Sequence, residues 1–122
     1  MNVAKILSLL DQLYPGKKVI QNKDRNGNVT EIICEISNDK ITSEAVAVID
    51  STTPHYHKTL TETYEVIRGK LVLVKGKEKY LLQVGDTMVI EPHEIHSAEG
   101  DETWIKVTSN PAWTIMDHIV AR

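Results

Sequence analysis

Short runs of residues with strand character follow one another along most of this 122-residue chain, and turn residues separate them at short intervals. After Gly16 these runs read "KKVIQNK", "VTEIICEI", "SEAVAVID", "ETYEVIR", "KLVLVK", "EKYLLQV", "DTMVIE", "HSAE" and "TWIKVTS". The separators include Asn26-Gly27, Arg68-Gly69, Lys75-Gly76, Gly85-Asp86 and Gly100-Asp101. Strands at this spacing predict an all-β sandwich or barrel.

The first two strands are expected to form a hairpin, because Asn-Gly is a strong signal for a tight turn between strands. Along the second strand Ile32, Cys34 and Ile36 share one face. Glu31 and Glu35 share the other face. This alternation predicts one buried face and one face in contact with water.

One helix is predicted before the strands, over residues 2–14. Its apolar residues recur at helical spacing, at Val3, Ile6, Leu7, Leu10 and Leu13. Asn2 can cap its start, and Pro15-Gly16 ends it. The barrel is expected to occupy about residues 17–122, so we interpret residues 1–122 as a single domain. The less regular tail after Asn110-Pro111 is expected to cover an open end or edge of the sheet.

Charge and composition exclude several classes of protein. The net charge of −3 argues against a basic nucleic-acid-binding protein. No stretch approaches the length of a membrane span, and no secretory signal is visible at the N-terminus. The one cysteine, Cys34, excludes an internal disulfide and is compatible with a reducing compartment. We therefore expect a soluble, cytoplasmic protein.

Four of the five histidines lie in two groups. His55 and His57 are two residues apart, so on a strand both side chains would point to the same side, and Glu62 follows shortly after. His93 and His96 come just after a proline turn. Each feature taken alone is compatible with a surface or loop position, but their joint occurrence favours a metal site. Three imidazoles and one carboxylate suit Mn, Fe, Co, Ni or Zn, whereas Ca and Mg prefer oxygen ligands.

These motifs resemble those of small single-domain cupins. The first cupin motif, G-x5-H-x-H-x(3,4)-E-x6-G, fits from His55 to Gly69, although Ile49 takes the place of its leading glycine. The second, G-x5-P-x-G-x2-H-x3-N, fits at Gly85 and His96. There Pro92 lies one place late, His93 replaces a glycine, and Gly100 replaces the asparagine. The departures fall at turn positions and leave the ligand positions intact.

The resemblance implies a cupin-type jelly-roll β-barrel of six to eight strands with one divalent transition-metal ion inside. It implies that His55, His57, Glu62 and His96 are the metal ligands, since each matches a ligand position of the family. His93 is not a ligand position. The resemblance also implies a homodimer.

Catalytic and substrate-binding residues remain open at this level. Tyr64 shares the parity of Glu62 and is expected to point into the barrel, as is Met88, and either residue is also compatible with a core position. Tyr64 or His93 could act as an acid or base. Arg68 or Lys106 could bind an anionic substrate if they face inward, whereas a solvated strand face is the alternative for both.

Three functions are compatible with these features. The first is a metal-dependent enzyme of carbohydrate metabolism, an isomerase or lyase acting on a small sugar, sugar acid or sugar phosphate. The second is an Fe(II)-dependent dioxygenase, which would use the same ligand set. The third is a small-ligand binding or sensing module without turnover, because one fold hosts many functions.

Overall fold

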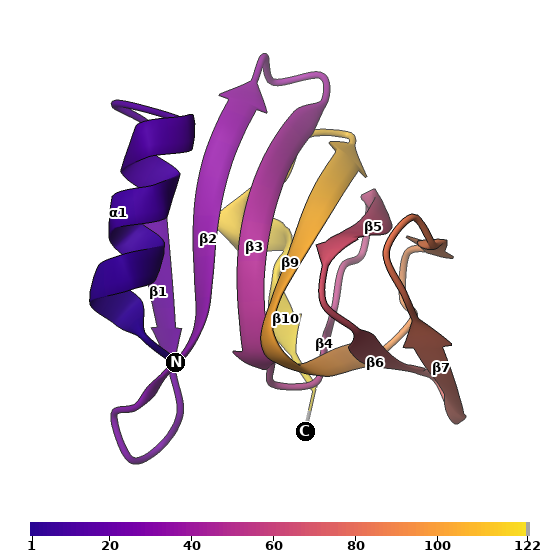
Figure 1. The fold of residues 1–122 in the computed structure, drawn as a ribbon. Coiled ribbons are helices and arrows are strands. Elements are labelled where there is room, and N and C mark those ends of the chain that lie inside the picture. Colours follow the sequence, from indigo (N-terminus) through magenta and orange to yellow (C-terminus); the bar gives the residue numbers. More distant parts are fainter. Residues whose placement is uncertain (122) are drawn as a thin grey trace.

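A curled antiparallel sheet forms the body of the molecule, and one helix lies along its outer face (Figure 1). The computed structural model describes residues 1–121. The elements in chain order are α1 (Val3–Leu13), β1 (Val19–Lys23), β2 (Val29–Asn38), β3 (Ser43–Ser51), β4 (His55–Tyr56), β5 (Thr61–Arg68), β6 (Leu71–Lys75), β7 (Glu78–Leu82), β8 (Thr87–Ile90), β9 (His96–Asn110), the 3-10 helix η1 (Ile115–Asp117) and β10 (Ile119–Val120). The expected all-β barrel architecture with a short N-terminal helix is confirmed.

Strand β9 organises the sheet because it pairs with four other strands. Along one edge it pairs with β3, from Ser43↔Ser109 to Ser51↔Glu99. Along the other edge its first part pairs with β6 and its second part with β5. At its first residue, His96 also pairs with His55 of β4. β9 therefore joins β4 and β6 along its N-terminal part and β5 along its C-terminal part.

The sequence predicted two strands here, separated by Gly100-Asp101, and this prediction is wrong. β9 runs without interruption from His96 to Asn110. Gly100 serves close packing inside the strand and not a turn, because a Cβ atom at this position would lie 2.9 Å from the carbonyl oxygen of Ile49. The Thr103 hydroxyl occupies the same space and donates a hydrogen bond to the carbonyl oxygen of Lys70, 2.5 Å away.

Helix α1 begins as predicted, with the Asn2 side chain accepting a hydrogen bond from the backbone N–H of Lys5 at 3.2 Å. Its apolar stripe packs on the outer face of the sheet. The buried apolar cluster between the helix and the sheet consists of Ile6, Leu10, Ile32, Cys34, Val46, Val48 and Trp104. Within residues 1–121, no helix has the length and apolar character needed to cross a membrane.

The inner face of the sheet carries a second apolar cluster inside the curl. Its buried members are Ala47, Ile49, Tyr64, Val66, Leu71, Leu73, Leu82, Ile90, Ala98 and Ile105. In β3, Val46 and Val48 face the helix while Ala47 and Ile49 face the interior, as the two-residue period of a strand requires.

The predicted alternation along β2 is present, but its acidic face lies toward the interior of the half-barrel and not on the outer surface. Ile32 and Cys34 are buried under the helix. Glu31, Ile33 and Glu35 are only partly exposed and line a cavity inside the curl. The reason is that both faces of β2 are covered, one by α1 and the other by the opposite wall of the half-barrel.

We expect Leu10→Ala to lower the free energy of unfolding by about 2–5 kcal/mol, because Leu10 is fully buried between α1 and the sheet. Leu13→Ala in the same helix is the matched control. Leu13 is 56% exposed, so this change should cost no more than about 0.5 kcal/mol. Urea unfolding measures both. Equal losses would mean that α1 packs through a different face.

Candidate metal centre

Four buried side chains bring their ligand atoms together at one end of the half-barrel. One ligand atom from each of His55, His57, Glu62 and His96 lies within 4.8 Å of all the others. Their exposed fractions are 7%, 2%, 5% and 1%, so the cluster is shielded from bulk water. These are the four residues that the family resemblance implied as metal ligands. The structure brings all four together.

The backbone explains this convergence. His55 in β4 is paired directly with His96 at the start of β9. Strand β4 ends at Tyr56, so His57 enters the site from the connector that follows. That connector leads to Glu62, which begins the inward-facing row of β5. Strands β4, β5 and β9 and the connector after β4 thus each supply one of the four side chains.

Each of the three imidazoles is oriented by a backbone carbonyl. Nδ1 of His55 lies 2.8 Å from the oxygen of Thr53, Nδ1 of His57 lies 2.5 Å from that of Asp117, and Nδ1 of His96 lies 2.9 Å from that of Glu94. A carbonyl oxygen can only accept, so each Nδ1 carries the hydrogen. In the neutral rings Nε2 therefore has the free lone pair, which is the state in which a histidine binds a metal.

Two Nε2 atoms lie close to one carboxylate oxygen of Glu62. Nε2 of His57 lies 3.0 Å from Oε1 of Glu62, and Nε2 of His96 lies 3.3 Å from the same oxygen. Within residues 1–121, Nε2 of His96 is a buried side-chain atom without a hydrogen-bond partner. A buried polar atom in this state is costly. The donor set and this orphaned nitrogen both fit a bound transition-metal ion.

The electrostatics of the cluster agree with this interpretation. Burial opposes a charge on His57, but the hydrogen bond and charge of Glu62 raise the pKa of the imidazole above its ordinary value. Burial also opposes ionisation of Glu62, yet His57 and His96 hold the pKa of the carboxyl below its usual range. Burial, and then the nearby His96, lower the pKa of His55 to about 3, which keeps that ring neutral. The site therefore favours a cation beside the carboxylate.

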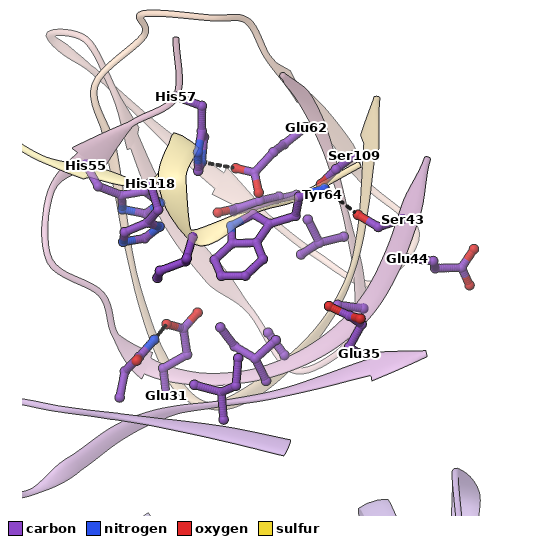
Figure 2. Close-up of a pocket in the computed structure, with 18 residues that line it drawn as sticks. Glu31, Glu35, Ser43, Glu44, His55, His57, Glu62, Tyr64, Ser109 and His118 are labelled. Atoms are coloured by element: carbon purple, nitrogen blue, oxygen red, sulfur yellow. Dashed lines mark hydrogen bonds and ion pairs between the residues drawn. The ribbon is translucent and has the colours of Figure 1, made fainter. Parts of the chain in front are cut away.

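A cavity of about 190 Å³ opens beside the cluster (Figure 2). His55, His57 and Glu62 lie at one side of it, and Glu31 lies on the other. Much of the remaining wall is apolar and includes Ile20, Ile33, Ala45, Ala47, Val107, Trp113 and Ile115. Tyr64, Ser43 and Ser109 add hydroxyl groups. An apolar chamber with a few polar groups near a metal is typical of a small-molecule site.

The other residues singled out in the sequence lie in different places. Tyr64 is buried and lines the cavity, with its ring centroid 6.1 Å from that of His96. Met88 packs against the inner apolar cluster. The guanidinium of Arg68 lies 5.2 Å from the ring centroid of Trp104, on the helix side of the sheet. Nζ of Lys106 lies 3.5 Å from a carboxylate oxygen of Glu44. His93 is exposed, in a turn with φ of 70°.

The sequence did not point to two residues that the fold places at the site. The ring of His118 stacks on that of His55, with 4.4 Å between centroids, and lines the cavity. Glu31 lines the cavity and accepts a hydrogen bond from the side chain of Asn22 at 2.9 Å. Burial, with the negative charge of Glu62 adding to it, raises the pKa of Glu31 to about 7, although the Asn22 hydrogen bond opposes this. The hairpin alternation was the one available signal for Glu31. His118 had none, because its position depends on how the tail folds back.

Comparison with known families decides the identity of the fold. The cupin domain model matches residues 44–105, which is half of the chain and includes all four clustered residues. The chain belongs to the cupin family. No curated protein matches this cupin at the level of sequence.

Solved structures agree with the family. Pac13 from Streptomyces, described as a nucleoside dehydratase, superposes with a TM-score of 0.77 at 15% identity over 89% of this chain and 88% of its own. A cupin 2 conserved barrel domain protein from Rhodopseudomonas palustris gives 0.72 at 16% identity, over 88% and 79%. The Fe(II) form of HppE gives 0.65 at 14% identity, over 78% and 56%. At these identities the likeness establishes the fold alone.

We expect His57→Ala and His96→Ala each to reduce bound transition metal sharply, because each removes an Nε2 atom from the cluster. His93→Ala is the control and should keep the metal, since His93 lies outside the cluster. Elemental analysis of protein purified without added ions measures this, with circular dichroism to check the β signal. Full metal content in both cluster variants would refute the ligand assignment.

Glu31→Gln should stabilise the protein at pH 8 and leave it unchanged near pH 4.5. The folded-state pKa of Glu31, about 7, lies above its unfolded value. The contribution of Glu31 to the free energy of unfolding is therefore fully present below its unfolded pKa. It is lost as the pH rises through the folded value of about 7. The glutamine has no charge to bury, so the gain at pH 8 should be about 1–3 kcal/mol. Urea unfolding with a chelator present measures the difference, and a gap that is constant with pH would contradict this assignment.

Proposed function

We propose that this cupin is a metal-dependent enzyme acting on a small polar molecule such as a sugar, by isomerase- or lyase-type chemistry. One observation supports this above the others. One nitrogen from each of three imidazoles and one carboxylate oxygen meet beside a cavity of about 190 Å³, which His55, His57 and Glu62 help to line. A divalent transition-metal ion held there would act as a Lewis acid toward oxygen atoms of the substrate.

The charge of the cavity wall supports a neutral substrate over the sugar acids and sugar phosphates. Among the described residues, no lysine or arginine lines the cavity. Three glutamates besides Glu62 line it, namely Glu31, Glu35 and Glu44. An anion would meet like charges there. The two cations considered from the sequence do not line the cavity, because Arg68 lies over Trp104 and Lys106 is paired with the Glu44 carboxylate. An uncharged hydroxylated ring would place its C–H faces on the apolar wall and its oxygens near the cluster.

Tyr64 and Glu31 would supply the polar contacts beside the cluster. Burial, together with the charge of Glu62, raises the pKa of Tyr64 well above its ordinary value, so the phenol keeps its proton and can donate a hydrogen bond. Glu31, on the other side of the cavity, can exchange a proton near neutral pH because burial raises its pKa to about 7. A donor and a proton acceptor on different sides of one cavity suit proton transfer between adjacent carbons.

An Fe(II)-dependent dioxygenase is the second candidate. The observation that favours it is the apolar wall directly beside a ligand set that iron also accepts. HppE, a structural neighbour, is described with Fe(II), but its low identity carries no activity to this chain. A binding module without turnover is the third candidate, and the homodimer implied by the family resemblance also stays a prediction.

We expect metal-free protein to gain turnover of neutral sugars or nucleosides on adding Mn, Fe, Co, Ni or Zn, with no turnover by His96→Ala. Each sugar should be tested beside its phosphate ester, and the acidic wall predicts tighter binding of the neutral member. Proton NMR detects isomerised and eliminated products alike, because both reactions change the pattern of C–H resonances.

A parallel assay addresses the dioxygenase. Protein loaded with Fe(II) without air is exposed to oxygen together with candidate thiols or diketones, and oxygen consumption is recorded. Consumption that requires His96, in the absence of any sugar conversion, would replace the first proposal with the second. Saturable ligand binding without turnover in either assay would favour the binding module.

A further inference from the structure

The chain after β9 folds back over the segment that carries His55, His57 and Glu62 and makes hydrogen bonds to its backbone. This return segment, residues 113–121, lies beyond the residues that match the cupin domain model. β10 pairs with β4 through Ile119↔Tyr56 and Val120↔His55. The backbone N–H of Ala121 donates to the oxygen of Pro54 at 2.9 Å. At the other end, the N–H of Trp113 donates to the buried Ser43 hydroxyl at 2.8 Å.

Asp117 makes the densest set of contacts within the return segment. Its carboxylate accepts hydrogen bonds from three consecutive backbone N–H groups of the connector between His57 and Glu62. Oδ1 accepts from Lys58 at 2.7 Å, and Oδ2 accepts from Thr59 and Leu60 at 3.1 Å each. A carboxylate that accepts several backbone N–H groups fixes the shape of a loop strongly.

The same residue also fixes the imidazole of His57. The backbone oxygen of Asp117 lies 2.5 Å from Nδ1 of His57 and determines which nitrogen faces the cluster. The side chain of Asp117 thus fixes the backbone of the connector. Its backbone oxygen fixes the orientation of the His57 ring, which lies just before the connector. Both effects act on the distance between His57 and Glu62.

We propose that Asp117 is a positioning residue for the metal centre, which docks the return segment onto the ligand-bearing connector and holds His57 and Glu62 in coordinating geometry. This inference rests on the proposed metal site, but not on the identity of the substrate. It follows that the site is assembled only when the return segment is in place. Outer contacts of this kind typically change metal affinity by about 10–100-fold.

Asp117→Asn provides the test, with Co²⁺ as the probe because its visible absorption reports the ligands around it. An asparagine turns an N–H₂ group toward backbone donors, so part of the contact set is lost. Co²⁺ affinity should fall about 10–100-fold by titration. The spectrum of the Co²⁺ form should also shift toward that of His57→Ala, which a general loss of stability would not cause.

Asp24→Asn is the matched control. Oδ1 of Asp24 also accepts backbone N–H groups, from Asn26 at 2.8 Å and Asn28 at 3.0 Å, but in the β1–β2 turn. This variant should bind Co²⁺ as the wild type does. If the wild type itself fails to bind Co²⁺, the proposed metal site is wrong. If the wild type binds and Asp117→Asn binds equally well with an unchanged spectrum, only the positioning role is overturned.

A measurement on the wild type keeps the inference testable if Asp117→Asn does not fold. Coupling between two sites is reciprocal, so metal binding must stabilise the contacts of Asp117 if those contacts favour metal binding. Adding Zn²⁺ should slow hydrogen exchange at the amides of Lys58, Thr59 and Leu60 relative to those of Asn26 and Asn28. Equal changes in both groups would overturn the inference.

Discussion

The central feature of this structure is a buried cluster in which imidazole nitrogens lie against one carboxylate. Oε1 of Glu62 lies 3.0 Å from Nε2 of His57 and 3.3 Å from Nε2 of His96. The carbonyl groups behind the rings hold a hydrogen on each Nδ1, so in the neutral rings Nε2 presents its lone pair to the carboxylate. Bringing acceptors together in a dry interior is unfavourable unless a cation joins them. The cluster therefore favours a positive charge beside Glu62, and a bound metal ion would supply that charge and also give the unpaired Nε2 of His96 a partner.

The rest of the fold brings these buried side chains together. β9 pairs with β4 at its first residue and with β5 along its C-terminal part, and the sheet curls so that the inward-facing side chains of both strands meet. Helix α1 covers the outer face of the sheet, so the inner face can be hollow without exposing both sides of β2 and β3 to water. The return segment then holds the ligand connector. Apolar clusters on both faces of the sheet stabilise the fold, and the candidate metal centre lies on the inner face.

The grouping of His55, His57 and Glu62 was identifiable from the sequence because the signal is local, whereas the cupin motif was needed to favour His96 over His93. His55 and His57 are two residues apart and Glu62 follows them closely, so their spacing survives in any fold that keeps that strand order. Gly100 shows the opposite case. A glycine beside an aspartate looks like a turn, yet its lack of a Cβ atom serves contact with Thr103 and Ile49. Ile49, one of the residues that surround Gly100, is distant along the chain, so the local sequence pattern does not reveal this contact.

The sequence by itself determined the strand-rich architecture and the N-terminal helix, because periodicity encodes these directly, and its match to the cupin motifs indicated the metal ligands. Only the tertiary structure decided that Glu31 faces the cavity, that His118 stacks on His55 and that Asp117 holds the connector. Each of these depends on the direction in which the sheet curls and on where the tail returns. Those properties arise from the packing of the whole chain, so no short stretch of residues carries them.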